Sequence, residues 1–199
     1  MNIKYLGHAC FKLSDGEKSL IIDPYKDGSV NGLKPLRETA NQVICTHEHA
    51  DHFGKECVEI VEPVEFDITE IPSWHDDQQG ALRGPNTMFV IKMDGLKIAH
   101  IGDLGCELNA EQKAQLSDLD VLMIPVGGYF TINAAQAKNI VDALRPKVVI
   151  PMHYRGDDFG YDVLAKVDSF VALCDKVENC GNEIDPAKHS GVVVMDFER

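Results

Sequence analysis

The segment His47-Glu48-His49-Ala50-Asp51-His52 places three imidazoles and the Asp51 carboxylate within six residues. Neutral imidazole is the commonest metal ligand in proteins, and a mixed nitrogen and carboxylate donor set suits zinc, manganese or iron. The segment differs from the helical H-E-x-x-H motif, because the fourth residue after His47 is Asp51 and not a histidine. The apolar run 42–45 precedes it, so we expect a strand that ends in a metal-binding loop rather than in a solvated polar turn.

The composition is that of an ordinary globular enzyme, with 44% apolar and 26% charged residues. A length of 199 residues suits one large domain or two tightly fused halves. Because no linker or repeat divides the chain, we expect a single domain over residues 1–199. Acidic residues outnumber basic ones 32 to 19, which argues against nucleic acid or an anionic membrane as the partner. We expect a small-molecule substrate, and an anionic one stays open because bound metal ions would make the cleft locally positive.

The cysteines and the start of the chain indicate the compartment. The six cysteines form no C-x-x-C pair, no signal peptide precedes the first strand-like segment, and no apolar stretch is long enough to span a membrane. A reduced, cytoplasmic location is therefore expected. The sequence leaves the oligomeric state open.

Hydrophobic patterning predicts short strands in the first half of the chain and alternating helices and strands in the second. Strands are expected at residues 3–6, 10–13, 20–23, 43–45, 64–68, 87–93, 97–101, 121–126, 147–151 and 192–197. Helices are expected at 110–116, with Asn109 as the cap, and at 133–144 and 161–173. Strands that face each other with helices outside make an α/β sandwich.

Two metal ions need about seven or eight protein ligands, so further donors are expected at the ends of other strands. His153 follows the apolar run 148–152, and His75 also follows a strand-like stretch. Asp103 lies between two glycines, which let the backbone turn sharply, and a carboxylate at that place could bridge two cations. Each of the three, taken alone, could equally be an ordinary polar loop residue.

Taken in order, these motifs resemble the metallo-β-lactamase-fold hydrolases, in which H-x-H-x-D-H is followed by a lone His, a lone Asp and a final His. The resemblance covers most of the chain and is closer still to a small branch that includes L-ascorbate-6-phosphate lactonase-like proteins. It implies a four-layer αββα sandwich. The supporting segments are Gly7-His8-Ala9-Cys10-Phe11, Leu20-Ile21-Ile22-Asp23-Pro24, Thr46 to His52, His100-Ile101-Gly102-Asp103-Leu104-Gly105, Pro125-Val126-Gly127-Gly128-Tyr129 and Ile150-Pro151-Met152-His153-Tyr154.

The resemblance implies two divalent metal ions, with zinc favoured and manganese or iron as alternatives. One ion would be held by His47, His49 and His75, the second by Asp51, His52 and His153, and Asp103 would bridge them. His75 is preferred over His100 as a ligand, because His100 and Asp103 have opposite parity on a regular strand and should face apart. His100 is therefore expected to support the site or to pack in the core.

The implied activity is that of a metal-dependent hydrolase in which a metal-bridging hydroxide attacks a small ester, lactone or phosphoester. Asp51 would both bind a metal and accept or orient the proton of the nucleophile. The chain has neither a G-x-S-x-G nucleophile motif nor a glycine-rich phosphate loop of Walker or Rossmann type. The candidate substrate contacts are His8, Arg83, Asn86, Thr131 and Tyr154.

Three other functions compete with this one. A nuclease of the same superfamily would be expected to carry extra clamping segments and a basic surface, and this acidic chain has neither. A diiron redox protein of the fold would resemble H-x-E-x-D, whereas His49 stands at that position. A non-catalytic metal-binding or regulatory module would keep the same ligands without turnover, and the sequence leaves this alternative open.

Overall fold

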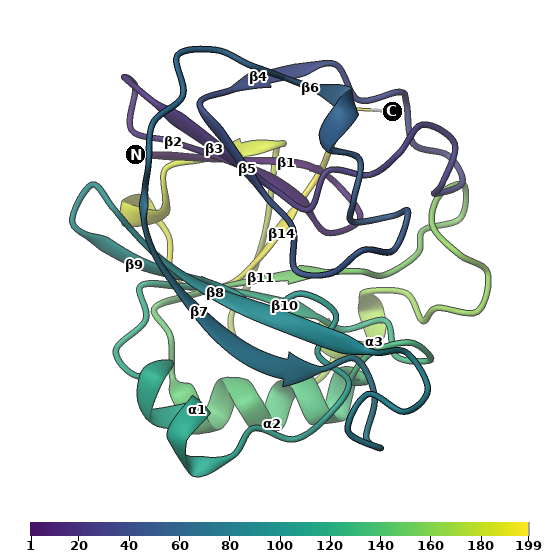
Figure 1. The fold of residues 1–199 in the computed structure, drawn as a ribbon. Coiled ribbons are helices and arrows are strands. Elements are labelled where there is room, and N and C mark those ends of the chain that lie inside the picture. Colours follow the sequence, from purple (N-terminus) through teal and green to yellow (C-terminus); the bar gives the residue numbers. More distant parts are fainter. Residues whose placement is uncertain (199) are drawn as a thin grey trace.

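The computed structural model describes residues 1–198 and places two β-sheets face to face (Figure 1). The smaller sheet has five strands in the order β13-β1-β2-β3-β5. Its first three strands in sequence form an antiparallel meander, whereas β5 pairs parallel with β3. The bounds are β1 Asn2–Gly7, β2 Cys10–Ser14, β3 Ser19–Ile22, β5 Gln42–Ile44 and β13 Glu183–Ile184.

The larger sheet has seven strands in the order β12-β14-β11-β10-β9-β8-β7. An antiparallel hairpin of β7 and β8 continues through β9 into four parallel strands. Strands β10 and β11 are buried along their whole length, as their uninterrupted apolar runs predict for parallel strands covered on both faces. The bounds are β7 Asp67–Trp74, β8 Pro85–Met93, β9 Leu96–His100, β10 Val121–Pro125, β11 Val148–Met152, β12 Val177–Cys180 and β14 Gly191–Met195.

Helices α1 (Ala110–Gln115), α2 (Ala134–Leu144) and α3 (Asp168–Val171) cover the outer face of the larger sheet (Figure 1). The side chain of Asn109 caps α1 as expected, by accepting a hydrogen bond from the backbone of Gln112. Among the residues described, no helix is both long and apolar enough to cross a membrane.

The outer side of the smaller sheet is covered differently. A two-stranded sheet of β4 (Glu38–Ala40) and β6 (Val58–Ile60) lies there, together with the 3-10 helix η1 (Lys55–Cys57). Residues of this layer pack with Leu6 and Ile21 in a separate apolar cluster. The expected α/β sandwich is confirmed, and in the part of the chain that the structure describes this outer layer uses short strands and a 3-10 turn in place of an α-helix.

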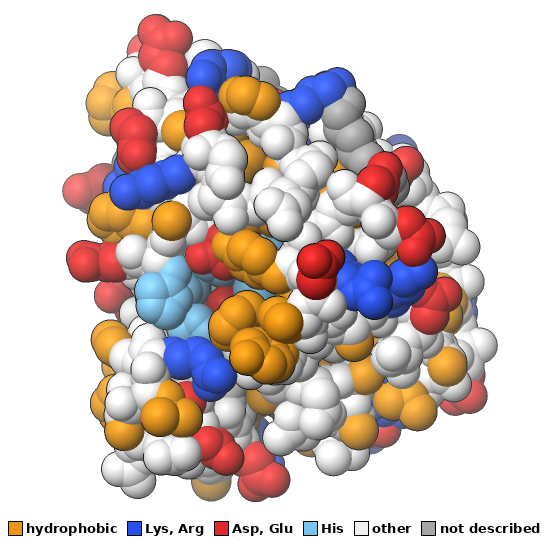
Figure 2. Space-filling model, turned by 90° about the vertical axis from the view of Figure 1, so that its right-hand side faces the viewer, with side chains coloured by type: hydrophobic (Ala, Val, Ile, Leu, Met, Phe, Trp, Pro, Cys, Tyr) orange, Lys and Arg blue, Asp and Glu red, His pale blue; other side chains and the backbone are white. Residues whose placement is uncertain are grey.

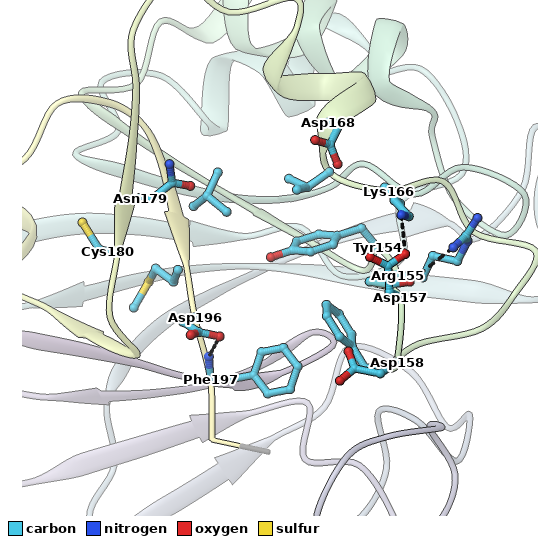
Figure 3. Close-up of a pocket in the computed structure, with 15 residues that line it drawn as sticks. Tyr154, Arg155, Asp157, Asp158, Lys166, Asp168, Asn179, Cys180, Asp196 and Phe197 are labelled. Atoms are coloured by element: carbon cyan, nitrogen blue, oxygen red, sulfur yellow. Dashed lines mark hydrogen bonds and ion pairs between the residues drawn. The ribbon is translucent and has the colours of Figure 1, made fainter.

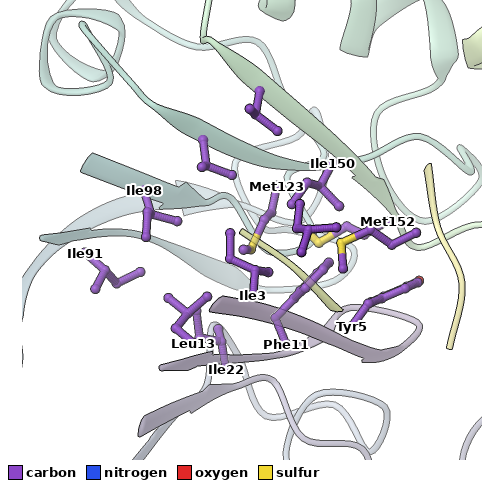
Figure 4. Packing of buried hydrophobic residues seen from close by; sticks show 14 of the residues in the cluster. Ile3, Tyr5, Phe11, Leu13, Ile22, Ile91, Ile98, Met123, Ile150 and Met152 are labelled. Atoms are coloured by element: carbon purple, nitrogen blue, oxygen red, sulfur yellow. The ribbon is translucent and has the colours of Figure 1, made fainter. Parts of the chain in front are cut away.

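The main hydrophobic core fills the space between the two sheets. Figure 4 shows Ile3 and Phe11 of the smaller sheet pointing toward Ile98, Met123 and Ile150 of the larger one. All five side chains are fully buried, and burial of each stabilises the fold by about 1.5–3 kcal/mol. This core fixes the two sheets against each other and so holds the ends of their strands in fixed relative positions.

Two expected elements are wrong in their bounds. The strand expected at 64–68 begins only at Asp67 and continues to Trp74, so that β7 leads directly into His75. The helix expected at 161–173 is reduced to α3, because the backbone before it bonds elsewhere: the N–H of Ala165 donates to the carbonyl of Gly127, and the carbonyl of Ala165 accepts from Arg155. The C-terminal part also contains β12, β13 and a 3-10 helix η2 (Pro186–Lys188) that the patterning does not reveal.

Candidate metal centre

Polar side chains from both sheets meet at one edge of the sandwich. Each lies just after a strand: His8 after β1, the segment 46–52 after β5, His75 after β7, Asp103 after β9 and His153 after β11. Figure 2 shows histidine side chains gathered in a hollow of the surface, with acidic and hydrophobic side chains at its border and a basic side chain beside it. The topology therefore assembles the site from strand ends that are far apart in the sequence.

Asp103 lies at the centre of this cluster, and its carboxylate is almost fully buried. Its Oδ1 atom is 3.3 Å from Nε2 of His52, and its Oδ2 atom is 3.2 Å from Nε2 of His75 and 3.0 Å from Nε2 of His153. Ligand atoms around a tetrahedral zinc ion with bonds of about 2.0–2.2 Å are themselves about 3.3 Å apart. The spacing of these four side chains is thus that of donors around a metal.

The donors fall into overlapping groups whose ligand atoms lie within 4.8 Å of one another. The groups are His47, His49 and His75; then His8, Asp51, His52 and His153; and finally His47, His52 and Asp103. All residues expected as ligands are therefore brought together. Asp103 touches members of the first two groups, which is the position that a bridging carboxylate requires.

Several donor atoms in the cluster are buried without a hydrogen-bond partner among the described residues. They are Nε2 of His47, Nε2 of His52, Oδ1 of Asp103 and Nε2 of His153. The carboxylate of Asp103 lies 3.0–3.3 Å from the rings of His52 and His153, but these atoms do not have hydrogen-bond geometry. A buried polar atom without a partner costs about 1–3 kcal/mol, so natural proteins seldom leave four in one place. Divalent cations would satisfy these atoms, and the nitrogen and carboxylate donors are those that zinc accepts. The residues present therefore fit a metal site.

The other ring nitrogen of three candidate ligand histidines is held by a neighbouring group. Nδ1 of His52 lies 2.7 Å from a carboxylate oxygen of the fully buried Asp23. Nδ1 of His47 lies 3.0 Å from the hydroxyl of Thr46, which itself donates to Asp23. Nδ1 of His75 lies 3.1 Å from the backbone carbonyl of Phe130. Such contacts fix the tautomer and direct Nε2 toward the metal.

Asp23 and Phe130 were not identified as site residues from the sequence. The carbonyl of Phe130 is a backbone group, so no residue type could have revealed it. Asp23 did carry a signal, because it is a carboxylate directly after the apolar run 20–22 and before a proline.

The expectation that Asn86 contacts substrate is wrong. Asn86 is only 1% exposed, and its amide nitrogen donates to Ser73 and to the carbonyl of Ile101. Its amide oxygen accepts a hydrogen bond of 3.0 Å from the backbone N–H of Asp103. Asn86 therefore positions Asp103 from the inner side, and Gly102, with φ of +54°, lets the backbone turn between them.

His8 contacts Asp51 rather than solvent. Its Nε2 atom lies 3.1 Å from Oδ2 of Asp51, and its ring centroid is 4.1 Å from that of His153. His8, Asp23 and His153 all have left-handed backbones, with φ of +57°, +49° and +53°. Non-glycine residues in this region cost about 1–3 kcal/mol each and gather at functional sites. The fold accepts this strain at three points around the same cluster.

Burial and neighbouring charges set the protonation of the site. Burial, followed by the charge of His52, lowers the pKa of His47 to about 3. Burial and the neighbouring His153 lower the pKa of His8 to about 4. Burial works against ionisation of Asp51, but the charge of His52 and the hydrogen bond from His8 outweigh it and hold the pKa of Asp51 well below its usual range. At neutral pH the cluster therefore offers an unprotonated imidazole at His47 and an ionised carboxylate at Asp51.

His100 is buried beside the cluster but has no free nitrogen. Its Nε2 atom lies 2.9 Å from the carbonyl of Ala9, and its Nδ1 atom accepts a hydrogen bond from the N–H of Gly102. Nδ1 also lies 4.0 Å from the carboxylate of Asp23. His100 therefore lies beside the candidate ligands and supports the turn that carries Asp103.

Two of the other expected substrate contacts, Arg83 and Thr131, lie close to His75. The guanidinium of Arg83 lies 5.6 Å from the ring centroid of Phe130, the residue that holds His75. The loop that carries Arg83 is ordered by Asp76, whose carboxylate accepts four backbone N–H groups at 2.8–3.0 Å. Thr131 is half-buried and its hydroxyl bonds to the carbonyl of Ile132.

Tyr154 is not at the mouth of the site. It is 4% exposed and belongs to the apolar cluster beneath the helices, where it also borders a separate cavity (Figure 3). The expectation that it contacts substrate is wrong, because its side chain is buried and packs in this apolar cluster.

Comparison with known proteins identifies relatives over most of the chain. A family model described as a beta-lactamase superfamily domain matches residues 2–153. A UPF0173 metal-dependent hydrolase of Archaeoglobus fulgidus is 31% identical, with 77% of this chain and 83% of the relative covered. One from Thermococcus onnurineus is 30% identical, with 77% of this chain and 84% of the relative covered.

A solved structure is similar over the whole chain. It is that of a Thermotoga maritima protein proposed to be a Zn-dependent hydrolase of the metallo-β-lactamase superfamily, with a TM-score of 0.77, 31% identity and 99% of both chains covered. The fold and the donor cluster thus define a metal-dependent hydrolase with the metallo-β-lactamase fold. Within this class, the chain belongs to the UPF0173 metal-dependent hydrolases of the beta-lactamase superfamily. The closer resemblance to lactonase-like proteins stays a prediction.

Proposed function

We propose that this protein is a binuclear hydrolase that cleaves a small ester, lactone or phosphoester. The proposal assigns one divalent ion to His47, His49 and His75, a second to Asp51, His52 and His153, and the bridging position to Asp103. The observation that carries it is the contact of one carboxylate, Asp103, with His75 from the first group and with His52 and His153 from the second. Zinc is the preferred ion, since its tetrahedral sites accept nitrogen and carboxylate donors.

When bound, the two ions supply an activated water and polarise the bond to be cleaved. The chain's own contribution is to place an acceptor for the proton of that water. Asp51 suits this role because its carboxylate is ionised at neutral pH and is partly accessible, with 14% of the side chain exposed. His8 holds Oδ2 of Asp51 from behind, so that the carboxylate keeps one orientation.

Arg83 would favour an anionic substrate. Its loop is ordered by the bonds to Asp76, and its cationic head lies over Phe130, next to the backbone that holds His75. A fixed guanidinium binds a carboxylate or phosphate group well, because its N–H donors match both oxygens. We therefore propose a substrate whose anionic group lies beside the scissile bond, with Thr131 at the same border.

Two further proposals concern the whole chain. The six cysteines are free thiols, which supports a reduced, cytoplasmic location. Residues 1–199 would form one domain, because the first and last strands of the chain contribute to the same core between the sheets.

A hydrolysis screen tests this function. Metal-free protein would be supplied with zinc or manganese and offered phosphomonoester, phosphodiester, lactone and thioester substrates, and the responding substrate would name the bond. At saturating metal, Asp51→Asn should lower kcat, whereas the matched variant Asp77→Asn in the exposed neighbouring loop should not. Turnover that resists both chelator and Asp51→Asn would contradict the proposal. Bound metal without any turnover would favour the regulatory module, and bound iron with oxygen consumption would favour the redox alternative.

A further inference from the structure

A second group of side chains that could hold a metal lies at the β12 edge of the larger sheet, four strands along from β9, the strand that precedes Asp103. Glu178 and Cys180 belong to β12, the edge strand of the larger sheet, and His189 follows η2. One donor atom from each of these three residues lies within 4.8 Å of the other two. None of them belongs to the donor groups of the main centre.

The distances and the donor types suit a transition metal. Nδ1 of His189 lies 3.0 Å from Oε2 of Glu178 and 3.9 Å from Sγ of Cys180. Around a tetrahedral zinc ion, with bonds of about 2.0–2.2 Å to nitrogen and oxygen and about 2.3 Å to sulfur, these separations would be about 3.3 and 3.6 Å. Small rotations of the exposed Glu178 and the partly buried Cys180 and His189 side chains would close that difference.

We propose that Glu178, Cys180 and His189 form a second metal site, which is separate from the catalytic centre. This site would bind a single zinc-like divalent ion. A thiolate, an imidazole and a carboxylate together select zinc over magnesium or calcium, which prefer oxygen donors alone. Binding would release the thiol proton of Cys180 to solvent, because the ligand is the thiolate. Solvent would complete the coordination, since the side chains of Glu178 and His189 are 48% and 16% exposed.

The backbone holds the three donors on the same side. Glu178 and Cys180 are two residues apart on a strand and therefore point to one face of the sheet. That strand is paired along its length with β14. His189 is placed by η2, where its N–H bonds to the carbonyl of Pro186 and the side chain of Asp185 caps the turn. The donors thus come from two segments that are each ordered independently of a metal.

The location suggests what the ion would do. Between β12 and β14 the chain leaves the larger sheet, pairs with β1 through β13, and returns through η2. An ion bound by both β12 and His189 would fix the segment between β12 and β14 to the edge of the larger sheet. Cys180 also borders the cavity of about 840 Å³ between β12, β14 and the loop 155–159 (Figure 3). A bound ion would therefore stabilise one wall of this cavity.

The alternative is a simple ion pair of Glu178 and His189 with Cys180 as a bystander. Cobalt(II) distinguishes the two, because thiolate-to-cobalt charge transfer gives a near-ultraviolet band that histidine and carboxylate ligands do not produce. Protein already loaded with zinc at its main centre would be titrated with Co²⁺. We expect the thiolate band to appear with one equivalent bound in the wild type and to be lost in Cys180→Ser.

Cys57→Ser is the matched control, because Cys57 is also partly exposed and lies 3.7 Å from the carboxylate of Asp27, but belongs to no group of three possible metal donors among residues 1–198. It should keep the band and the extra equivalent. A second measurement needs no variant: zinc should slow alkylation of Cys180 at least tenfold, as read by peptide mapping, and leave Cys57 unaffected. A wild type with no thiolate band, or equal alkylation of Cys180 with and without zinc, would overturn the proposal.

Discussion

The carboxylate of Asp23 and the Nδ1 atom of His52 lie 2.7 Å apart, and neither side chain is exposed to solvent. Asp23 also accepts hydrogen bonds of 2.7 Å from the backbone N–H and from the hydroxyl of Thr46. One carboxylate therefore fixes both the ring of His52 and the start of the loop that carries His47. The protein itself therefore holds the segment 46–52, which carries candidate metal ligands, in place.

Replacement of Asp23 by asparagine should weaken metal binding without unfolding the protein. Asn keeps the shape and one acceptor oxygen but removes the charge that orients His52, and losses of this kind typically cost about 10–100-fold in metal affinity. Competition with a chromophoric chelator measures the change. Glu17→Gln, in an exposed turn, is the control. Wild-type affinity in Asp23→Asn would show that the contact does not orient the ligand.

The ligand assignments predict different metal losses for three single variants. Asp103→Ala should disturb both ions, since Asp103 contacts donors of both groups, whereas His75→Ala should mainly empty one. His100→Ala should keep both, because neither ring nitrogen of His100 is free. Elemental analysis of the purified variants gives the count. If His100→Ala lost a full equivalent of metal and His75→Ala did not, His100 rather than His75 would be the ligand.

Gly102 should tolerate no side chain. A Cβ atom there would lie 2.4 Å from Oδ1 of Asn86 and 2.7 Å from Cβ of Thr46. Gly95 provides a control, because its φ of +75° carries similar backbone strain and nothing lies within 4 Å of its Cβ position. Gly102→Ala should lower the free energy of unfolding in urea by about 1–3 kcal/mol more than Gly95→Ala, and should also reduce bound metal. Equal losses in the two variants would mean that the turn at Gly102 can shift.

The sequence indicates more of the candidate donors than of the groups that hold them. His47, His49 and His52 share a short segment, and metal binding is the ordinary reason for such a cluster. His75 and His153 are candidates because His153 follows an apolar run and His75 a strand-like stretch, and loops at strand ends often carry functional groups. Asn86 was misread because a polar residue after Pro85 looks like a loop contact. Its role depends on Ser73, Ile101 and Asp103, which are brought to it by the fold alone.

The C-terminal part shows where local patterning fails. Residues 161–173 have a helical pattern, but only Asp168–Val171 is helical, because Ala165 bonds to Gly127 and Arg155 instead of to its own turn. Local propensity is a weak prior that such tertiary bonds override. The pairing of β13 with β1 is equally invisible in sequence, since it joins two segments about 180 residues apart.

His8 predicts a pH dependence of stability in the metal-free protein. Its pKa of about 4 in the fold lies below the value of 6.5 expected in the unfolded chain, so the unfolded state binds more protons between these limits. Stability should therefore fall as the pH falls from 6.5 to 4, and His8 should contribute up to about 3 kcal/mol of this loss. Urea unfolding of chelator-treated protein at several pH values measures it. His8→Gln should flatten the curve in this window, and a curve parallel to that of the wild type would refute the assignment.

The most direct test of the central claim is a zinc titration of metal-free protein in which bound zinc and turnover of a responsive ester, lactone or phosphoester are followed together. A centre bridged by Asp103 predicts that zinc binding ends at two equivalents in the Cys180→Ser variant, which removes the separate thiolate site, and that turnover reaches its plateau only as the second equivalent binds. In Asp103→Ala both the stoichiometry and the turnover should collapse. Saturation at one equivalent with full turnover would contradict the binuclear account.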